Sequence, residues 1–336
     1  MGLTICHYSP FHEVIEGGIK RSIRQQRKVL EKEKQIELVT DAEKDYDILH
    51  LNLGDPLSIY QMFRAKRSGK KVIFHSHITE EDFRDSFKFS NRLAPIVGKI
   101  SDFVYSRADL LIAPSEYTRR VLEQRGIETS IKVLTNGIDT ERLEGENQSR
   151  SELEKKFETD GFHAVNLGMI LERKGLEDFI NVGEKVDEDL IWFGSTGGKI
   201  AAKRKTKKLI EKSPENVKFP GYIEDVRDAF TLADVFFFPT REENQGISLL
   251  EAAYREKPLV VRDIEVYEDL LEHEVNCLKA DSVDGFAKQI KRLRDNEKLR
   301  RKIGENARET AEKHTLQNVG KKLVEIYENL DGDAAK

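Results

Sequence analysis

The chain has 336 residues, of which 38% are apolar and 35% charged, and its formal net charge is -5. This length and composition suffice for two domains with hydrophobic cores, and the acidic balance excludes the basic signature of a nucleic-acid-binding protein. Only Cys6 and Cys277 are present, and neither a run of 18 apolar residues nor a signal-peptide core occurs, so we expect a cytoplasmic protein without a disulfide framework or a cysteine metal site.

The first predicted elements are a strand over Leu3 to Tyr8 and a helix over residues 19 to 34, joined by a turn that contains Gly17 and Gly18. Glycines in such a turn let the backbone approach a phosphate group, although turns without a ligand also contain them. The helix is rich in cations, which form either a solvated face or a surface attracted to anionic lipid by about 1 kcal/mol per cation. These cations are Lys20, Arg21, Arg24, Arg27 and Lys28.

A D-x-D triplet formed by Asp45, Tyr46 and Asp47 precedes a strand expected at residues 48 to 52. In some enzymes such a triplet binds the divalent metal that accompanies a nucleotide diphosphate. No further ligand set accompanies this triplet, so we interpret both aspartates as strand-entry residues and expect no metal site.

Two histidines follow the strand predicted by residues 69 to 75, with His75 at its end and His77 just beyond it. The carboxyl ends of parallel strands border the ligand crevice of a doubly wound fold. A histidine at this place is either a hydrogen-bonded structural residue or a residue that faces a ligand.

Apolar and basic residues intermingle between residues 83 and 103. They form either the buried face of a helix or an outward-facing segment that contacts a membrane or an acceptor tail. The apolar members are Phe83, Phe87, Phe89, Leu93, Ile96, Val97, Ile100 and Phe103, and the basic members are Arg84, Lys88, Arg92 and Lys99.

Residues 108 to 120 predict a strand, a turn and the start of a helix, with Ser115 as its N-cap. Residues 131 to 139 end the first half of the chain. The stretch from residue 140 to 159 that follows is charged and contains glycine.

The second half opens with a strand, a loop and a helix in residues 163 to 180, and Arg173 and Lys174 precede Gly175 at the helix entry. Cationic side chains and helix amides at the same helix entry can bind a diphosphate together. An Arg-Lys pair at a helix entry is, however, also a common surface feature. Further strands are expected at residues 190 to 194, 216 to 223 and 258 to 262, and helices at residues 284 to 312 and 315 to 330.

The most informative stretch runs from Arg241 to Pro258. An apolar run over Asp234 to Thr240 predicts a buried strand, which carries Glu243 to the edge of a sheet. Gly246 permits close backbone approach, and a helix is expected to start there because apolar residues then recur at helical spacing. Its first amides favour a phosphate, and Glu251 lies two turns further in, within reach of a hydroxyl. An E-x7-E spacing alone does not distinguish this site from ordinary surface acids.

The stretch from Asn216 to Cys277 resembles the donor-binding half of the retaining glycosyltransferases of family 4, which have the GT-B architecture. The resemblance implies an α/β fold with two Rossmann-like, doubly wound domains facing a central cleft. It places an acceptor-side domain at residues 1–145, a nucleotide-sugar-binding domain at residues 146–312 and a helix at residues 313–330 that crosses back to the first domain. In the resembled family an interdomain linker follows an NG-[IV]-D turn, which implies a linker over residues 140 to 159 here. Residues 331–336 are expected to form a disordered tail.

The same resemblance implies roles for individual residues and no cofactor or metal. Glu243 contacts the donor sugar, either as a nucleophile or as a positioning group, and His77, with His75 as the second candidate, lies near the reacting carbon. The donor diphosphate is expected at Gly17, Gly18, Arg173, Lys174, Gly246, Ile247 and Ser248, and the nucleoside at Gly221, Tyr222, Ile223 and Glu251. Many members have Gly-Arg-Leu where this chain has Gly168, Met169 and Ile170, and we expect Arg173 to replace the missing arginine.

A narrower resemblance rests on residues 75 to 84, HSHITEEDFR, and residues 90 to 95, SNRLAP. These motifs are similar to those of the bacterial membrane-surface enzymes of the alpha-monoglucosyldiacylglycerol synthase type. This resemblance implies transfer of a hexose, with UDP-glucose as the favoured donor, to a glycerolipid hydroxyl on the inner face of the cell membrane. The alternatives are a soluble or polymer-bound sugar acceptor and a non-catalytic subunit that binds a nucleotide sugar. The candidate acceptor or anionic-membrane surface comprises Lys20, Arg21, Arg24, Phe83, Arg84, Phe87 and Lys88.

Overall fold

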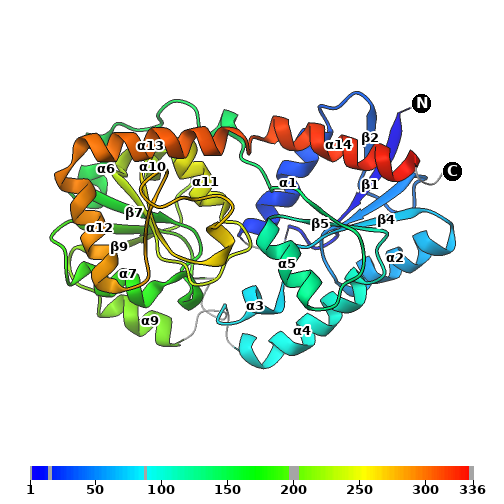
Figure 1. The fold of residues 1–336 in the computed structure, drawn as a ribbon, viewed down its shortest axis with the longest axis horizontal. Helices are drawn as coiled ribbons and strands as arrows, with labels where there is room; N and C mark the ends of the chain where they lie inside the picture. The colour runs from blue at the N-terminus through cyan, green and yellow to red at the C-terminus, as the bar shows by residue number, and fades with distance from the viewer. Residues whose placement is uncertain (1, 14–16, 87–88, 197–203, 333–336) are drawn as a thin grey trace. The chain divides into compact units, whose positions relative to one another are not determined.

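The computed structural model describes residues 2–13, 17–86, 89–196 and 204–332 (Figure 1). Contacts divide the chain into two compact units. The first comprises Met1–Phe83, Asn91–Ile138 and His314–Lys336, and the second comprises Arg84–Ser90 and Asp139–Lys313. The division after Ile138 lies earlier in the chain than the boundary set from the sequence, and the segment Arg84–Ser90 groups with the second unit.

The first unit contains a six-stranded parallel sheet with the order β2-β1-β3-β4-β5-β6. The chain reverses its direction of strand addition between β1 and β3, and ligands of doubly wound sheets bind at the carboxyl ends near such a point. The strands are β1 Leu3–Tyr8, β2 Ile36–Val39, β3 Ile48–Leu51, β4 Lys71–His75, β5 Leu110–Ala113 and β6 Ile131–Val133.

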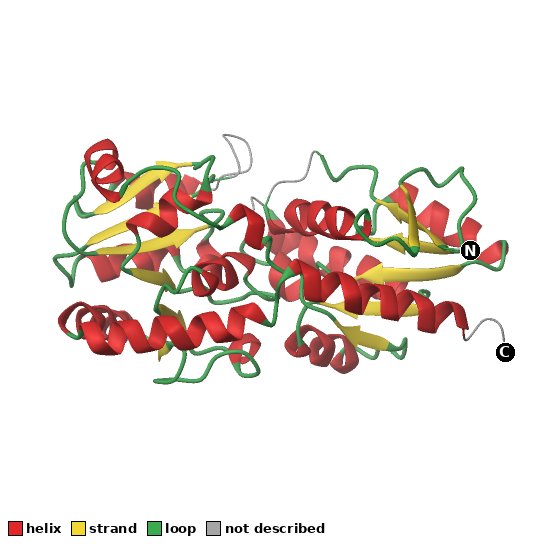
Figure 2. Cartoon of the chain, turned by 90° about the horizontal axis from the view of Figure 1, so that it is seen from above, coloured by secondary structure: helices red, strands yellow, loops and turns green. Residues whose placement is uncertain are grey.

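Helices cover both faces of this sheet (Figures 1 and 2). On one face the core includes Met62, Val104 and Leu122, and on the other it includes Val29 and Leu323. The helices are α1 Gly18–Leu30, α2 Pro56–Arg67, α3 Glu80–Phe83, α4 Ser90–Tyr105, α5 Glu116–Gln124 and α14 Leu316–Gly332. Ser115 caps α5 as predicted, because its side chain accepts a hydrogen bond from the amide of Thr118.

The second unit repeats this plan with a six-stranded parallel sheet of order β12-β11-β10-β7-β8-β9. Its strands are β7 His163–Leu167, β8 Asp189–Phe193, β9 Val217–Gly221, β10 Val235–Phe238, β11 Leu259–Arg262 and β12 Leu278–Ala280. Its helices are α6 Arg150–Phe157, α7 Leu176–Gly183, α9 Arg204–Glu211, α10 Val226–Leu232, α11 Ile247–Tyr254, α12 Val283–Asp295 and α13 Glu297–Glu312, with 3-10 turns η1 Thr140–Arg142, η2 Glu172–Lys174 and η3 Glu265–Tyr267. The predicted α/β class with two doubly wound sheets is confirmed.

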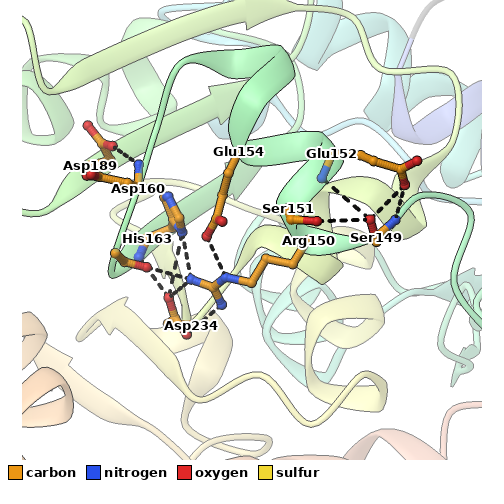
Figure 3. A network of polar contacts seen from close by, with 10 residues as sticks. Ser149, Arg150, Ser151, Glu152, Glu154, Asp160, His163, Asp189 and Asp234 are labelled. Carbon is orange, nitrogen blue, oxygen red and sulfur yellow. Dashed lines mark hydrogen bonds and ion pairs between the residues drawn. The ribbon is translucent and has the colours of Figure 1, made fainter.

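The expected linker over residues 140 to 159 is wrong in part, because it contains η1 and α6. Ser149 and Glu152 form a reciprocal capping box that starts α6, and the S-x-x-E spacing was its signal in the sequence. Arg150 then binds the carboxylate of Asp234 at 2.7 Å, and the same carboxylate accepts from the amide of His163 at 2.9 Å (Figure 3). These bonds attach α6 to the amino end of the sheet, which is why the segment is helical.

Two helix ends also differ from the sequence expectation. The first helix ends at Leu30 instead of residue 34, because the chain must turn back to place Ile36 beside Leu3 in the sheet. The closing helix runs to Gly332, so the first two residues of the expected disordered tail are helical. Residues 333–336 lie outside the described residues. No helix in the described part of the chain is both long and apolar enough to cross a membrane.

The closing helix α14 packs on α1 within the first unit. Ile138 exchanges backbone hydrogen bonds with His314 and Leu316 at 2.9 and 3.0 Å, which anchors the start of α14 beside the last residue of the segment Asn91–Ile138. Further along, a Cβ added at Gly320 would overlap the Cγ2 atom of Val29 in α1. The close approach of these two helices therefore depends on the absence of a side chain at Gly320.

We expect Gly320→Ala to lower the free energy of unfolding by about 1–3 kcal/mol, because the new methyl group must displace Val29 in a packed core. Gly332→Ala is the matched control in the same helix, since its methyl group would meet no atom within 4 Å, and we expect a change within about 0.5 kcal/mol. Chemical denaturation followed by circular dichroism measures both. Equal losses in the two variants would contradict the packing described here.

Candidate functional site

A buried polar pair of the second unit joins two loops at the carboxyl ends of its strands. Lys174, in η2 after β7, donates to the carboxylate of Glu243, in the loop after β10, over 2.7 Å. Both side chains are largely buried, with exposed fractions of 14% and 12%. The sequence analysis selected both residues separately, and the structure brings them into direct contact.

Local geometry explains this contact. Gly175 has a φ of 80°, and a Cβ there would overlap the carbonyl of Pro239, so only glycine allows the two loops to lie this close. The amide of Arg241 donates to the carbonyl of Arg173 over 2.8 Å and aligns the two backbones. The loop register therefore presents Lys174 to Glu243.

Two opposing effects act on the charge of Glu243. Burial by itself raises the pKa of this carboxyl group, but the positive charges of Lys174 and Arg173 outweigh burial and hold the pKa below its ordinary value. The carboxylate is therefore ionised at neutral pH and acts as a hydrogen-bond acceptor. A charge of either sign left alone here would be costly to bury.

Arg173 connects the segments around this pair by hydrogen bonds. Its Nε atom donates to Ser86 over 2.7 Å, and its Nη1 atom donates to the carbonyl of Glu242 over 2.9 Å. Ser86 belongs to the short segment that groups with the second unit, and the sequence analysis did not identify it. The guanidinium is thus partly engaged by protein groups, whereas its expected contact with a diphosphate stays a prediction.

The helix predicted to begin at Gly246 does so. Gly246 is the N-cap residue of α11 with a φ of 89°, and a Cβ there would crowd the hydroxyl of Tyr267 at 3.4 Å. The amides of Ile247 and Ser248 form the first turn, where helix geometry supplies no intrahelical acceptor. This end of α11 therefore offers donors and a positive dipole to an anion.

The residues expected to bind the nucleoside lie at two places. Gly221 ends β9 with a φ of 90°, Tyr222 is 76% exposed, and Ile223 is buried. Glu251, on the second turn of α11, is fully buried, and its Oε1 atom lies 3.9 Å from Arg142 in η1. Arg142 was not identified from the sequence, and its position requires the folding of the expected linker.

The first unit gathers histidines at the carboxyl ends of β1, β3 and β4. His77 and His75 stack with ring centroids 4.2 Å apart, and His50 stacks on His75 at 5.9 Å. His7 lies beside His50 at 4.8 Å, and all four rings are buried. Both histidines proposed from the sequence therefore belong to one cluster, whose other two members went unrecognised.

Burial keeps this cluster neutral. It lowers the pKa of His77 to about 3 and that of His7 to about 4, and it holds the pKa of His50 and His75 well below the ordinary value. The four rings are also close together, so a proton on one ring would oppose the protonation of the others. His77 is therefore a hydrogen-bonding group and not a cation at neutral pH.

Asn52, just after β3, orients His77. Its Oδ1 atom lies 2.9 Å from His77 Nε2. Because an amide oxygen only accepts, the Nε2 atom of His77 must carry the proton and its Nδ1 atom must carry the lone pair. By the same reasoning Gln26 Nε2, at 3.0 Å, donates to His75 Nδ1. Asn52 and Gln26 were missed. The only sequence signal for Asn52 was a polar residue at the end of a buried strand, and Gln26 lies within α1.

The glycine turn before α1 lies in the same unit. Gly17, with a φ of 89°, is the N-cap of α1, and a Cβ at Gly18 would meet no atom within 4 Å. One turn further, Ser22 donates to Asn136 over 2.6 Å, and Gln26 donates to Ser22 over 3.0 Å. The turn is thus connected to the histidine cluster through α1.

The candidate membrane cations on α1 are partly paired. Lys20 and Arg24 bind Glu13 at 3.2 and 2.7 Å. Phe83 ends α3 in an intermediate environment, and Arg84 is exposed. Phe87 and Lys88 lie outside the described residues. The D-x-D aspartates also have structural partners, since Asp47 accepts from the amide of Thr4 and Asp45 pairs with Lys70.

Comparisons with known proteins agree with both halves of the chain. Residues 148–310 match the family model Glycosyl transferases group 1, and residues 12–142 match Glycosyltransferase Family 4. The chain is 33% identical over 335 residues to a processive diacylglycerol alpha-glucosyltransferase of Acholeplasma laidlawii, covering 98% of each chain. It is 27% identical to an alpha-galactosylglucosyldiacylglycerol synthase of Streptococcus pneumoniae, covering 94% of this chain and 87% of that one.

A solved structure shows the same fold. Anabaena HepE in complex with UDP-glucose superimposes with a TM-score of 0.78 at 16% sequence identity, covering 97% of this chain and 100% of that chain. At this identity the likeness concerns the fold alone.

Acidification from pH 7.5 to 5.5 is expected to destabilise the first unit. The folded-state pKa values of the four clustered histidines lie below the ordinary value of 6.5, so the unfolded chain binds protons that the folded unit does not bind. The stabilisation is present above pH 6.5 and is lost as the pH falls toward the folded values, by up to about 1.4 kcal/mol per pH unit and imidazole.

Scanning calorimetry at several pH values measures this loss. His50→Asn should reduce the pH dependence of the melting temperature, whereas Asn306→Ala, in α13 of the second unit, should leave it unchanged. A melting temperature of the first unit that stays constant down to pH 5.5 would show that the cluster is not buried in neutral form.

The position of the His77 proton can be observed directly. Nitrogen-15 spectra of the imidazole rings should show His77 as the tautomer protonated at Nε2, and Asn52→Ala should yield a mixture because the acceptor that selects this tautomer is lost. Asn306→Ala, in α13 of the second unit, is the control and should leave the His77 signals in place. Nδ1 protonation in the unsubstituted protein would contradict the assignment.

Proposed function

Because the chain belongs to glycosyltransferase family 4, we propose that it transfers glucose from UDP-glucose to a glycerolipid hydroxyl at a membrane surface, with retention of the alpha configuration. The observation that carries this proposal is the 33% identity to a diacylglycerol alpha-glucosyltransferase over nearly the whole of both chains. A second glycolipid synthase among the relatives supports the same acceptor class.

The second unit supplies the groups that the departure of UDP requires. Lys174 has three N–H donors, of which one is donated to Glu243, so its charge is held at the site with capacity for a phosphate oxygen. The first amides of α11 add further donors. Together these groups stabilise the negative charge that develops on the leaving diphosphate, and we propose that they do so without a metal.

Glu243 acts in this proposal as a positioning group. Its carboxylate is ionised and compensated by Lys174 at 2.7 Å, which makes it a good acceptor for sugar hydroxyls and a weaker nucleophile than a free carboxylate. The pair thus links the two events of the reaction, because the cation that meets the leaving phosphate also orients the group that holds the sugar.

His77 supplies a neutral imidazole with the lone pair on Nδ1. With a pKa of about 3 this ring is a poor proton acceptor at neutral pH, so we propose that it accepts a hydrogen bond from a hydroxyl of the substrate. The nucleoside contacts of Gly221, Tyr222, Ile223 and Glu251 belong to the same proposal, as does association with the inner face of the membrane.

Mass spectrometry of products tests the reaction. The purified protein is incubated with UDP-glucose, UDP-galactose or GDP-mannose and with vesicles that contain ester- or ether-linked glycerolipids bearing a free hydroxyl. We expect a monohexosyl lipid with UDP-glucose. Formation of UDP without glycolipid, or transfer only to an added oligosaccharide, would overturn the lipid acceptor, and no turnover with any donor would overturn the catalytic assignment.

A pair of matched lysine variants tests the site. We expect Lys174→Met to lower kcat by about 100-fold or more, because it removes a charge from the leaving group and unpairs the buried Glu243. Lys185→Met removes a lysine of the same unit that pairs with Asp284 on the surface, and it should retain normal kcat. Steady-state kinetics with UDP-glucose measures both variants, and equal rates would refute the role of Lys174.

A further inference from the structure

A second group of buried charges lies beside the loops that carry Lys174 and Glu243. Asp178, in the first turn of α7, is 9% exposed, and its Oδ2 atom accepts hydrogen bonds from Nε and Nη2 of Arg241 over 3.1 and 2.9 Å. The same oxygen accepts a hydrogen bond from Nη2 of Arg262, at the end of β11. One carboxylate oxygen thus joins two guanidinium groups that come from different segments of the chain.

Both arginines act on the loop that follows β10. Arg241 belongs to this loop and precedes Glu243 by two residues. Arg262 donates through Nε to the carbonyl of Pro239, at the start of the loop, over 3.2 Å. The Nη1 atom of Arg262 also donates to the carbonyl of Asp281 over 2.9 Å, which fixes the direction of the guanidinium. Side chains that converge on one carboxylate therefore hold the loop to α7 and to β11.

The two guanidinium groups need this carboxylate, because like charges at one place repel each other. The Arg262 side chain is 14% exposed, whereas the Arg241 side chain is 50% exposed. If the charge of Asp178 were removed, Arg241 could turn toward solvent, but Arg262 would stay confined. We therefore expect that loss of Asp178 releases the loop after β10 at Arg241.

The bond between Asp178 and Arg241 joins the same two segments as the pair of Lys174 and Glu243. Lys174 precedes Asp178 by four residues, at the entry to α7. The start of α7 is anchored independently by Leu176, which is fully buried in the core of the unit. The loop after β10 is thus the partner that moves when the bond is broken, and Glu243 moves with it.

Stability alone gives a weak reason for charges at this place. Buried charges lose hydration, and their mutual attraction returns only part of that free energy, so apolar residues of similar volume often stabilise a protein equally well. What the three charged side chains of Asp178, Arg241 and Arg262 provide is a defined geometry. They fix one loop relative to a helix and a strand, beside the carboxylate of Glu243.

We propose that Asp178 is a positioning residue that acts through Arg241 to keep Glu243 in place for the sugar of the donor. The inference deepens the proposed function and rests on it for the identity of the ligand. The tie between the two segments exists in the free protein. Loss of Asp178 should weaken contacts of the sugar more than those of the diphosphate, because Lys174 remains on the anchored segment.

Hydrogen exchange in the free protein tests the tie. The amide of Arg241 donates to the carbonyl of Arg173. In Asp178→Ala we expect this amide to exchange at least about ten-fold faster, because the loop opens more often. Asp178→Asn keeps an oxygen acceptor without the charge and should give an intermediate rate. An unchanged exchange rate in Asp178→Ala would overturn the proposal.

Asp234→Ala is the matched control. Asp234 holds Arg150 at 2.7 Å at the amino end of β10, so this variant also removes a carboxylate that binds an arginine in the same unit (Figure 3). It should leave the exchange of the Arg241 amide unchanged. Circular dichroism and melting temperature verify that both variants are folded.

Calorimetric titration with UDP and UDP-glucose distinguishes positioning from general damage. In Asp178→Ala we expect the Kd for UDP-glucose to rise about ten-fold, while the Kd for UDP changes less than about three-fold. The value of kcat should fall by about ten- to a hundred-fold, because small displacements of a positioned group are costly. Equal losses of affinity for both ligands would show a general effect on the unit and would overturn the positioning role.

A double-mutant cycle identifies the residue through which Asp178 acts. In protein that already carries Glu243→Gln, Asp178→Ala should lower the affinity for UDP-glucose by less than about two-fold further, since the group that it positions is already altered. A full additive loss would show that Asp178 acts independently of Glu243, and the proposal would fail.

The outcomes also separate this inference from the proposed function. Faster exchange of the Arg241 amide in Asp178→Ala, in a protein that binds neither UDP nor UDP-glucose, would uphold the positioning of the loop and refute the donor. Glucosylation of lipid by the unsubstituted protein, with kcat and amide exchange unchanged in Asp178→Ala, would uphold the proposed function and overturn the inference.

Discussion

The ammonium group of Lys174 lies 2.7 Å from the carboxylate of Glu243 in the interior of the second unit. The local backbone geometry keeps the two groups at this distance. Burying either charge alone is costly, so the two loops that carry them must stay in register. Gly175 allows the loops to touch, and Arg173 braces them from the side through Ser86 and Glu242.

The polar centre of the first unit is neutral, in contrast to the buried ion pair of the second unit. Its polar centre consists of imidazoles that burial keeps neutral, and amide side chains from Asn52 and Gln26 determine which ring nitrogen carries the proton. A neutral ring in this position can form hydrogen bonds without adding charge. The polar centre of the second unit is therefore a compensated pair of charges, whereas that of the first unit consists of neutral hydrogen-bonding groups.

The last helix of the chain belongs to the first unit, and its contacts reach the polar centre. The hydroxyl of Tyr327 lies 2.6 Å from His50 Nδ1, and His50 stacks on His75. Residues separated by most of the chain length thus support one cluster. The opposite face of the same sheet is covered by α2 and α4, whose outward sides carry exposed apolar residues.

The sequence by itself determined the α/β class, most of the strands and the helix that begins at Gly246. It also singled out Glu243 and Lys174 as candidate site residues. These features depend on local patterns: apolar runs bounded by glycine and proline, helical spacing, and short motifs that resemble a known family. The capping box of Ser149 and Glu152 was also a local signal, and it explains why the expected linker is helical.

Only the tertiary structure decided which distant residues touch. Asn52 with His77, Ser86 with Arg173, Arg142 with Glu251 and Tyr327 with His50 are pairs whose members look like ordinary polar residues in one dimension. The direction of the α4 stripe was open for the same reason, since a helical period shows that one side is apolar but not whether that side meets a core. Contacts between elements far apart in the chain settle these questions, and no local pattern encodes them.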